Sequence, residues 1–268
     1  MLILPSFIYQ IEETELIEIV EMDIKDELSL HKFDPDKIRF IRGSALAALN
    51  GENSPYGVPA VQTLIDTLDN ELEPPKRELD KPFLLSIKGV YSVGGRGTVA
   101  TGAVEQGTVK IGDNLELIGM RKDGKVTKTA CTGLEMFNKK LEVGQAGDDL
   151  GILLRGLKRE EVRRGQVLCK PGSLKVYSQF KGSVYLLTSE EGGRANGFKS
   201  GFRPQFYIRT ADITGDITLP DNVEIAVPGD HIEMTVNLGL QVPLEKGTQF
   251  SIREGGKTVG HGIVSEAF

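Results

Sequence analysis

Hydrophobic residues near the start of the chain recur every four positions, which is the spacing of one face of a helix. Within residues 13–30 this series consists of Leu16, Val20, Ile24 and Leu28. A similar series lies within residues 58–72, and Pro59 suits the first turn of a helix, where a missing N–H costs least. Residues 38–41 are apolar except for one position and are typical of a short strand. The order helix, strand, helix predicts part of an α/β domain.

The hydrophobic period changes to two after residues 73–78, whose adjacent prolines are typical of a linker. The alternation is clearest at Ile232, Met234, Val236 and Leu238. Glycines that mark turns recur about every 8–12 residues, a spacing that favours antiparallel barrels. We therefore expect a mostly β protein with an α/β remnant in residues 1–72, a linker at 73–80, and two antiparallel β-barrels in residues 81–172 and 173–268.

A Gly-Asp pair occurs twice in similar surroundings, as Gly112-Asp113 and as Gly229-Asp230, each followed by alternating hydrophobic residues. We interpret this echo as reuse of one hairpin turn and not as a sequence repeat.

Composition is ordinary for a folded protein, with 39% hydrophobic and 26% charged residues in 268, but the charge is unevenly distributed. Residues 1–80 carry 17 acidic and 7 basic side chains, a net of −10, whereas residues 81–268 carry 21 acidic and 25 basic, a net of +4. Five cations lie within residues 155–164. That segment could contact a phosphate backbone, or it could be a solvated surface in which Glu160 and Glu161 balance the cations.

Several site classes are not expected. No apolar run approaches the roughly 20 residues of a membrane helix. The three histidines (His31, His231 and His261) have no partner at ligand spacing, so we expect no metal site. Cys131 and Cys169 are interpreted as reduced core thiols. No Ser-His-Asp arrangement stands out, and we assign no catalytic residue.

Two short motifs resemble nucleotide-binding sequences weakly. Gly255-Gly-Lys-Thr258 looks like the end of a phosphate loop, but Ser251 stands where the first glycine is required, so a hairpin turn with an exposed Lys257 is favoured. The pattern D-x-x-G occurs at Asp212 and at Asp148, and no N-K-x-D accompanies it. The glycine-rich residues 94–98 could bring backbone close to a ligand, or could form an ordinary barrel turn.

Longer segments resemble the elongation factor Tu family. They are Asp80-Lys-Pro-Phe-Leu-Leu85, Gly95-Arg-Gly-Thr-Val99, Cys131-Thr-Gly-Leu-Glu-Met-Phe137, Leu153-Leu-Arg-Gly-Leu-Lys-Arg-Glu-Glu161, Arg164-Gly-Gln-Val-Leu168, Glu191-Gly-Gly-Arg194, Arg203-Pro-Gln-Phe206 and Ile252-Arg-Glu-Gly-Gly-Lys-Thr-Val-Gly260. The resemblance runs from about residue 11 to the end in family order, and residues 1–10 do not share it. The style is that of the bacterial and organellar branch.

The resemblance implies a GTP-binding domain followed by two β-barrels. Residues 11–72 would be the last helix–strand–helix part of that domain. Ser44, Ala45 and Leu46 match the family's final guanine-binding motif, in a loop after the last strand. The phosphate loop, both switches and N-K-x-D are missing from the sequence. GTP and Mg²⁺ serve the intact family, but we expect this chain, taken as an amino-terminally truncated form, to hold no cofactor and to be inactive as a GTPase.

The resemblance also implies an interface with aminoacyl-tRNA. Its positions here are Tyr91, Arg96, Thr101, Glu135, Arg164, Arg253, Lys257 and Thr258. Those in residues 91–135 would contact the aminoacyl end and terminal adenosine, Arg164 the 5′ end of the acceptor stem, and residues 253–258 the T stem. Many bacterial members have two acids in place of Lys88-Gly89, Arg in place of Asn138, and Asn in place of Asp149, and these departures lie by the aminoacyl pocket.

The implied function is delivery of aminoacyl-tRNA to the ribosome, with a nucleotide-exchange factor as a further partner, in a monomer without a membrane. The alternative is a GTP-independent module that binds tRNA or a protein. Val90-Tyr-Ser-Val93 and Gly102-Ala-Val-Glu-Gln-Gly107 look like mitochondrial members, so the mitochondrial matrix is expected, with the bacterial cytoplasm or a plastid as alternatives.

Overall fold

The structure is a computed structural model that describes residues 14–31, 33–72 and 74–268. The chain divides into two compact units, Met1–Pro75 and Lys76–Phe268. Residues 1–10, expected to lie outside the family pattern, are not among the described residues. None of the described helices combines the length and the apolar character that crossing a bilayer requires.

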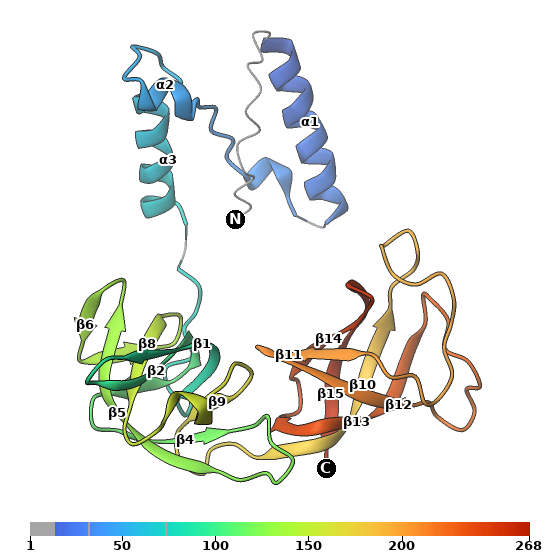
Figure 1. The fold of residues 1–268 in the computed structure, drawn as a ribbon. Coiled ribbons are helices and arrows are strands. Elements are labelled where there is room, and N and C mark those ends of the chain that lie inside the picture. The colour runs from blue at the N-terminus through green and yellow to red at the C-terminus, as the bar shows by residue number, and fades with distance from the viewer. Residues whose placement is uncertain (1–13, 32, 73) are drawn as a thin grey trace. The chain divides into compact units, whose positions relative to one another are not determined.

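The first unit is helical. It contains α1 (Thr14–Leu30), the 3₁₀ turn η1 (Pro35–Lys37), α2 (Ala45–Leu49) and α3 (Val58–Asn70) (Figure 1). Both predicted helices are confirmed, and Pro59 lies in the first turn of α3. Arg42 is bonded to both carboxylate oxygens of Glu21 on α1, at 2.7 and 2.9 Å. This bidentate bond holds the pKa of Glu21 below its usual value.

The strand predicted at residues 38–41 was wrong. Ile38 has an extended backbone, with φ −99° and ψ 123°, but residues 38–41 pair with no described strand. An extended segment becomes a strand only when a neighbour takes up its N–H and C=O groups. Among the described residues of this unit, the buried hydrophobic side chains are Leu28, Ala47 and Ala60. The hydrophobic pattern therefore identified an extended segment, but this segment pairs with no strand among the described residues.

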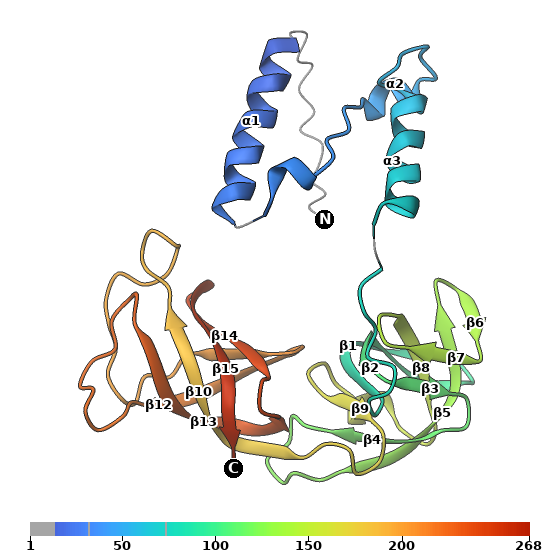
Figure 2. The ribbon, with the colours of Figure 1, turned by 180° about the vertical axis from the view of Figure 1, so that it is seen from behind.

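The first barrel of the second unit closes through six antiparallel strands in the order β4-β9-β1-β2-β8-β5, with β5 paired back to β4. The strands are β1 (Leu84–Val93), β2 (Gly97–Gln106), β4 (Asn114–Ile118), β5 (Thr127–Met136), β8 (Asp149–Leu154) and β9 (Val167–Cys169). The hairpin strand β6 (Lys139–Leu141) extends from β5, and η2 (Arg159–Glu161) precedes β9. A short ribbon of β3 (Thr108–Lys110) and β7 (Val143–Gln145) lies against the same barrel (Figure 2).

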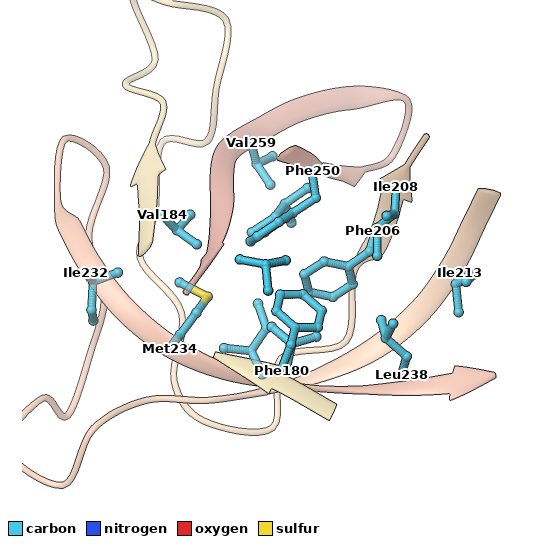
Figure 3. Packing of buried hydrophobic residues seen from close by; sticks show 14 of the residues in the cluster. Phe180, Val184, Phe206, Ile208, Ile213, Ile232, Met234, Leu238, Phe250 and Val259 are labelled. Atoms are coloured by element: carbon cyan, nitrogen blue, oxygen red, sulfur yellow. The ribbon is translucent and has the colours of Figure 1, made fainter. Parts of the chain in front are cut away.

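The second barrel is also closed and antiparallel, in the order β10-β13-β12-β11-β14-β15. Its strands are β10 (Val176–Leu186), β11 (Gln205–Ile208), β12 (Ala211–Thr218), β13 (His231–Pro243), β14 (Gln249–Glu254) and β15 (Lys257–Ala267). Figure 3 shows its core around the rings of Phe180, Phe206 and Phe250, whose centroids lie 5.0 to 6.2 Å apart. The alternation predicted along β13 is confirmed, since Ile232, Met234, Val236 and Leu238 are all buried. The expected mostly β fold with two barrels is therefore observed.

One turn is used five times in the second unit. In each, a backbone N–H donates to the side chain three residues later, a glycine precedes that side chain, and the reverse backbone bond closes the turn. The glycine-polar pairs are Gly112-Asp113, Gly147-Asp148, Gly165-Gln166, Gly229-Asp230 and Gly247-Thr248. The five glycines have φ between 89° and 99°, which side chains rarely adopt. The predicted reuse of a Gly-Asp turn is confirmed.

Hydrogen bonds join the two barrels. Arg209, at the tip of the β11–β12 hairpin, donates to Glu105 of the first barrel at 3.0 Å and to the Pro243 carbonyl at 2.9 Å. Its side chain is only 15% exposed. Backbone bonds on both sides of Gln241 link β13 to Met120 and Arg121, at 2.8 and 3.0 Å. The barrels therefore share a bonded junction.

The two cysteines are buried and unbonded to each other, as predicted. Burial raises the pKa of the Cys131 and Cys169 thiols to about 11, so both are protonated at neutral pH.

Candidate functional site

Two rows of outward-facing residues cross four strands of the first barrel. Strand register aligns Gly89 with Thr101, Thr101 with Gly151, and Gly151 with Glu135. The adjacent row runs from Tyr91 through Val99 and Leu153 to Gly133. Residues in one cross-strand row lie on the same face of a sheet. The structure therefore brings Tyr91, Thr101 and Glu135, which are far apart in sequence, onto one surface.

No side chains project from the glycine positions in the middle of this surface. Gly151 and Gly133 contribute no side chain, and the partly exposed Val99 and Leu153 lie beside them. A Cβ on Gly151 would lie 3.4 Å from Val99 and 3.7 Å from the Glu135 carbonyl oxygen, in ordinary contact, so the strip is low because Gly151 has no side chain and not because neighbours exclude one. We call this low strip of the sheet, in which Gly133 and Gly151 lie beside the apolar Val99 and Leu153, the groove; its apolar floor suits contact with a flat ring.

The walls of the groove are polar. Tyr91 is 60% exposed, and its ring lies over Gly89, where an added Cβ would come within 3.2 Å of it. The Glu135 carboxylate is exposed at the far end of the row. Lys88 pairs with Asp149 at 3.4 Å, and both are exposed. Thus two of the four positions that depart from the bacterial pattern, Lys88 and Asp149, form an ion pair with each other.

A hollow of about 670 Å³ adjoins the Leu153 end of this surface. Arg96, Arg155 and Lys158 line it together with Leu153 and Thr132. None of the three cations is within ion-pair distance of a carboxylate in the described part of the chain. Arg96 lies in the β1–β2 turn, where its N–H donates to the Val93 carbonyl. An apolar floor with unpaired cations at its edge matches a ligand that carries both a ring and a phosphate.

Arg164 lies elsewhere, at the junction of the barrels. Its Nε donates to the Thr210 carbonyl of the second barrel at 3.3 Å, and the side chain remains exposed. One cation of the basic segment therefore contributes to the barrel junction.

Residues 253–258 form the hairpin between β14 and β15, in which Glu254 and Lys257 are paired. Gly255 and Gly256 take positive φ values of 54° and 83°. Arg253 is folded over its own turn, with Nη2 donating to the Gly256 carbonyl at 2.7 Å and its guanidinium 5.2 Å from the Tyr207 ring. Lys257 is exposed and Thr258 half-buried. The predicted hairpin turn, in place of a phosphate loop, is confirmed.

The two D-x-x-G segments have structural roles. Asp212 and Gly215 lie within β12. Asp148 accepts from the Gln145 N–H in the repeated turn and from Arg77 at 3.1 Å.

Ser44 occupies a different position from the one expected. It is the N-cap of α2, and its hydroxyl accepts from the Ala47 N–H at 3.2 Å. Ala45 and Leu46 form the first turn of that helix. The expected loop after a strand was wrong, because no described strand precedes these residues and a serine side chain readily caps a helix.

Two of the three histidines flank one tyrosine on the second barrel. His231 and His261 are both cross-strand neighbours of Tyr185. The Tyr185 and His231 rings are 5.2 Å apart, and His261 Nδ1 is 3.1 Å from the Ser251 hydroxyl. Within the described residues, no three His, Cys, Asp or Glu side chains are placed to hold a metal ion.

Sequence reasoning missed the glycine floor, the Lys88–Asp149 pair and the cationic hollow. Each depends on strand register, which aligns positions as distant as Gly89 and Gly151. The glycines were visible as possible turn residues, but no signal in the linear sequence marked two of them as the floor of a groove.

Comparison with protein families assigns both barrels. Residues 97–169 match the family model for elongation factor Tu domain 2, and residues 173–267 match that for the elongation factor Tu C-terminal domain. The matches span 168 of the 268 residues and contain Thr101, Glu135, Arg164 and the β14–β15 hairpin; Tyr91 and Arg96 lie just before the first. The chain therefore contains domain 2 and the C-terminal domain of elongation factor Tu, in that order, and belongs to the family of translation factors that carries them.

Proposed function

We propose that this protein acts as an elongation factor Tu-like translation factor and binds the 3′ end of aminoacyl-tRNA on its first barrel. The observation that carries the proposal is the shallow groove with its cationic hollow, built from residues that the resemblance assigns to that ligand. An RNA end offers an unstacked base, ribose hydroxyls and phosphates, and the groove has complementary groups for each.

Each wall has a defined task in this proposal. The Tyr91 ring and the Val99–Leu153 floor contact flat or apolar parts of the ligand. The Glu135 carboxylate accepts hydrogen bonds from ribose hydroxyls or from a base. Arg96 lies by the aminoacyl ester, and the hollow that it lines takes the phosphate next to it. Thr101 supports the floor, since its hydroxyl donates to the Gly89 carbonyl at 3.4 Å.

The same RNA reaches the other assigned residues through its double-stranded part. We assign Arg164 to the phosphates at the 5′ end, and Arg253, Lys257 and Thr258 to the T stem. A hairpin that carries the exposed Lys257 and backbone N–H groups suits phosphate and 2′-OH contacts in the wide minor groove of A-form RNA. The bond to Gly256 and the Tyr207 ring hold Arg253 in place, so little conformational entropy is lost when RNA binds.

The proposal is tested by fluorescence anisotropy with labelled aminoacyl-tRNA. We expect binding that weakens steeply as salt rises, because phosphate contacts release counterions. Glu135→Ala should weaken binding roughly 10- to 100-fold, the range for loss of a charged hydrogen bond. Glu142→Ala is the matched control, since Glu142 is exposed and its side chain makes no described bond. Absence of binding at low salt, or equal effects of the two variants, would contradict the proposal.

We further propose that these 268 residues bind guanine nucleotide weakly and do not hydrolyse GTP. The sequence has no phosphate loop to supply backbone N–H groups and no Ser/Thr for Mg²⁺. The Ser44 hydroxyl already caps α2. Titration of the purified chain with a fluorescent guanine nucleotide should show no saturation at micromolar concentration, and tight binding would overturn this proposal.

We further propose an oligomeric state, two partners and a subcellular location for this protein. The protein acts as a monomer on the ribosome and contacts a nucleotide-exchange factor, and it resides in the mitochondrial matrix, with the bacterial cytoplasm or a plastid as alternatives. Support comes from the two translation-factor domains and from the mitochondrial style of residues 90–93 and 102–107. Subcellular fractionation with an antibody to the barrels tests the location.

The second candidate function is a GTP-independent module that binds RNA or a protein. It is favoured by the separation of the barrels as a compact unit, Lys76–Phe268, with its own cores. RNA binding that is equal with and without GTP, together with no association with the ribosome, would support this reading.

A further inference from the structure

The tip of the β5–β6 hairpin carries a bulky residue in an unfavourable backbone conformation. Phe137 and Asn138 form the two-residue connection between the paired Met136 and Lys139, and both have positive φ, 50° and 62°. A turn of this kind usually contains Asn or Gly at both positions. Asparagine tolerates the left-handed region, but a phenylalanine there is an outlier. The local backbone therefore does not account for the aromatic residue.

Packing does not account for it either. The Phe137 side chain is 84% exposed. Its strand neighbours Leu134 and Met136 point toward the barrel core, while Glu135 and Phe137 point outward. Because the ring of Phe137 remains in water, it adds little hydrophobic stabilisation to the folded state. Strain of this kind collects at binding sites, where a ligand compensates for it.

The surroundings of Phe137 indicate the ligand class. Lys139 and Lys140 follow it, are exposed, and form no ion pair with a residue in the described ranges. Glu135, at the end of the groove row, lies on β5 two residues before Phe137, which follows in the turn. An exposed ring beside two free cations is the combination that binds an unpaired nucleotide, with the base on the ring and the phosphate by the ammonium groups.

We propose that Phe137 is a stacking platform for the unpaired base that precedes the terminal nucleotide of a bound RNA 3′ end. The inference rests on the proposed function, in which the terminal nucleotide occupies the groove. The terminal base and the base before it reach the groove and Phe137 as unstacked bases, as they can be in a single-stranded end.

Replacement by asparagine separates a structural role from a binding role. Phe137→Asn should leave the thermal unfolding temperature unchanged or raise it, because asparagine suits φ near 50°. The same variant should weaken aminoacyl-tRNA binding about 5- to 150-fold, the range for loss of one base–aromatic stack. Phe137→Tyr keeps the aromatic ring, so its affinity for aminoacyl-tRNA should stay within about twofold of the wild-type affinity.

The readout is fluorescence of aminoacyl-tRNA with 2-aminopurine next to the terminal nucleotide. We expect quenching on binding to the wild type and to Phe137→Tyr, and little quenching with Phe137→Asn at saturation. Wild-type binding with the same affinity and quenching in Phe137→Asn would overturn this inference alone. A wild type that binds no aminoacyl-tRNA would overturn the proposed function, and this inference with it.

Discussion

Single glycines decide the shape of the groove more than any charged side chain. Gly151 lies between Thr101 and Glu135, and an added Cβ there would be in van der Waals contact with Val99 and the Glu135 carbonyl without a clash. Its φ is not in the left-handed region, so a small side chain is compatible with its backbone. The groove therefore exists because a residue without a side chain stands at this register position.

Gly151→Ala tests this at the residue scale. The added methyl lies 3.4 Å from Val99, in ordinary contact, so stability should change by less than about 1 kcal/mol. Affinity for aminoacyl-tRNA should fall several-fold because the methyl occupies the floor. Gly239→Ala on β13 is the matched control, a strand glycine whose nearest neighbour is also 3.4 Å away. Equal affinity in both variants, measured by anisotropy, would remove Gly151 from the site.

Glu191 gives a second residue-scale prediction. The Thr188 N–H and the Tyr185 hydroxyl donate to its carboxylate and lower its pKa from 4.5. A lowered folded pKa stabilises the protein above the unfolded value, and the stabilisation is lost as pH falls through the folded value. Glu191→Gln should therefore show a smaller drop in unfolding temperature than the wild type below about pH 4.5. Identical drops in a thermal scan would contradict this.

At the scale of elements, the five repeated turns set the strand connections. In each turn the glycine supplies the positive φ and the following side chain satisfies a backbone N–H. The short pattern Gly-Asp was recognisable in the sequence because both requirements are local. The turns at Gly165-Gln166 and Gly247-Thr248 were not predicted. In these turns Gln166 and Thr248 accept the hydrogen bond from the N–H three residues earlier, and Gln and Thr are less typical of turns than Asp is.

Gly112→Ala tests the turn against a close control. Gly112 has φ 99° with nothing within 4 Å of an added Cβ, and Gly94 is equally open without a positive φ. Gly112→Ala should destabilise the protein by about 1–2 kcal/mol through backbone strain alone, while Gly94→Ala should be neutral or slightly stabilising. Chemical denaturation of both variants gives the comparison, and equal stabilities would exclude the strain argument.

Features that depend on neighbouring residues could be predicted from the sequence, and features that depend on residues far apart in the chain could not. The two long helices, the alternation of β13 and the hairpin at Lys257 depend on a few neighbouring residues and were predicted correctly. The strand at residues 38–41 failed because a strand needs a partner elsewhere in the chain. The loop predicted at residues 44–46 was wrong because Ser44 caps α2 and the helix begins at the next residue. The glycine floor required register between strands far apart in sequence.

At the scale of the whole molecule, the barrel junction depends on a few bonds. Arg209 is nearly buried and donates to Glu105, which also accepts from the Ser86 hydroxyl. Removing a buried guanidinium leaves the Glu105 carboxylate without its charged partner. Arg209 therefore stabilises the junction together with the backbone bonds at Gln241.

Arg209→Ala should destabilise the Lys76–Phe268 unit by roughly 1.5–3 kcal/mol, the range for hydrogen bonds to charged groups. It should also separate the unfolding of the two barrels in calorimetry. Arg203→Ala is the control, because the Arg203–Asp216 pair at 3.6 Å is exposed and worth less than about 1 kcal/mol. A single unfolding transition of unchanged midpoint in Arg209→Ala would show that other contacts hold the barrels together.

The most direct test of the central claim is a photo-crosslink from the terminal nucleotide of aminoacyl-tRNA. We expect crosslinked peptides, identified by mass spectrometry, from the groove of the first barrel, at strands β1, β5 or β8 that carry Tyr91, Glu135 and Leu153. Crosslinks confined to the second barrel, or none under conditions where the RNA is bound, would contradict it.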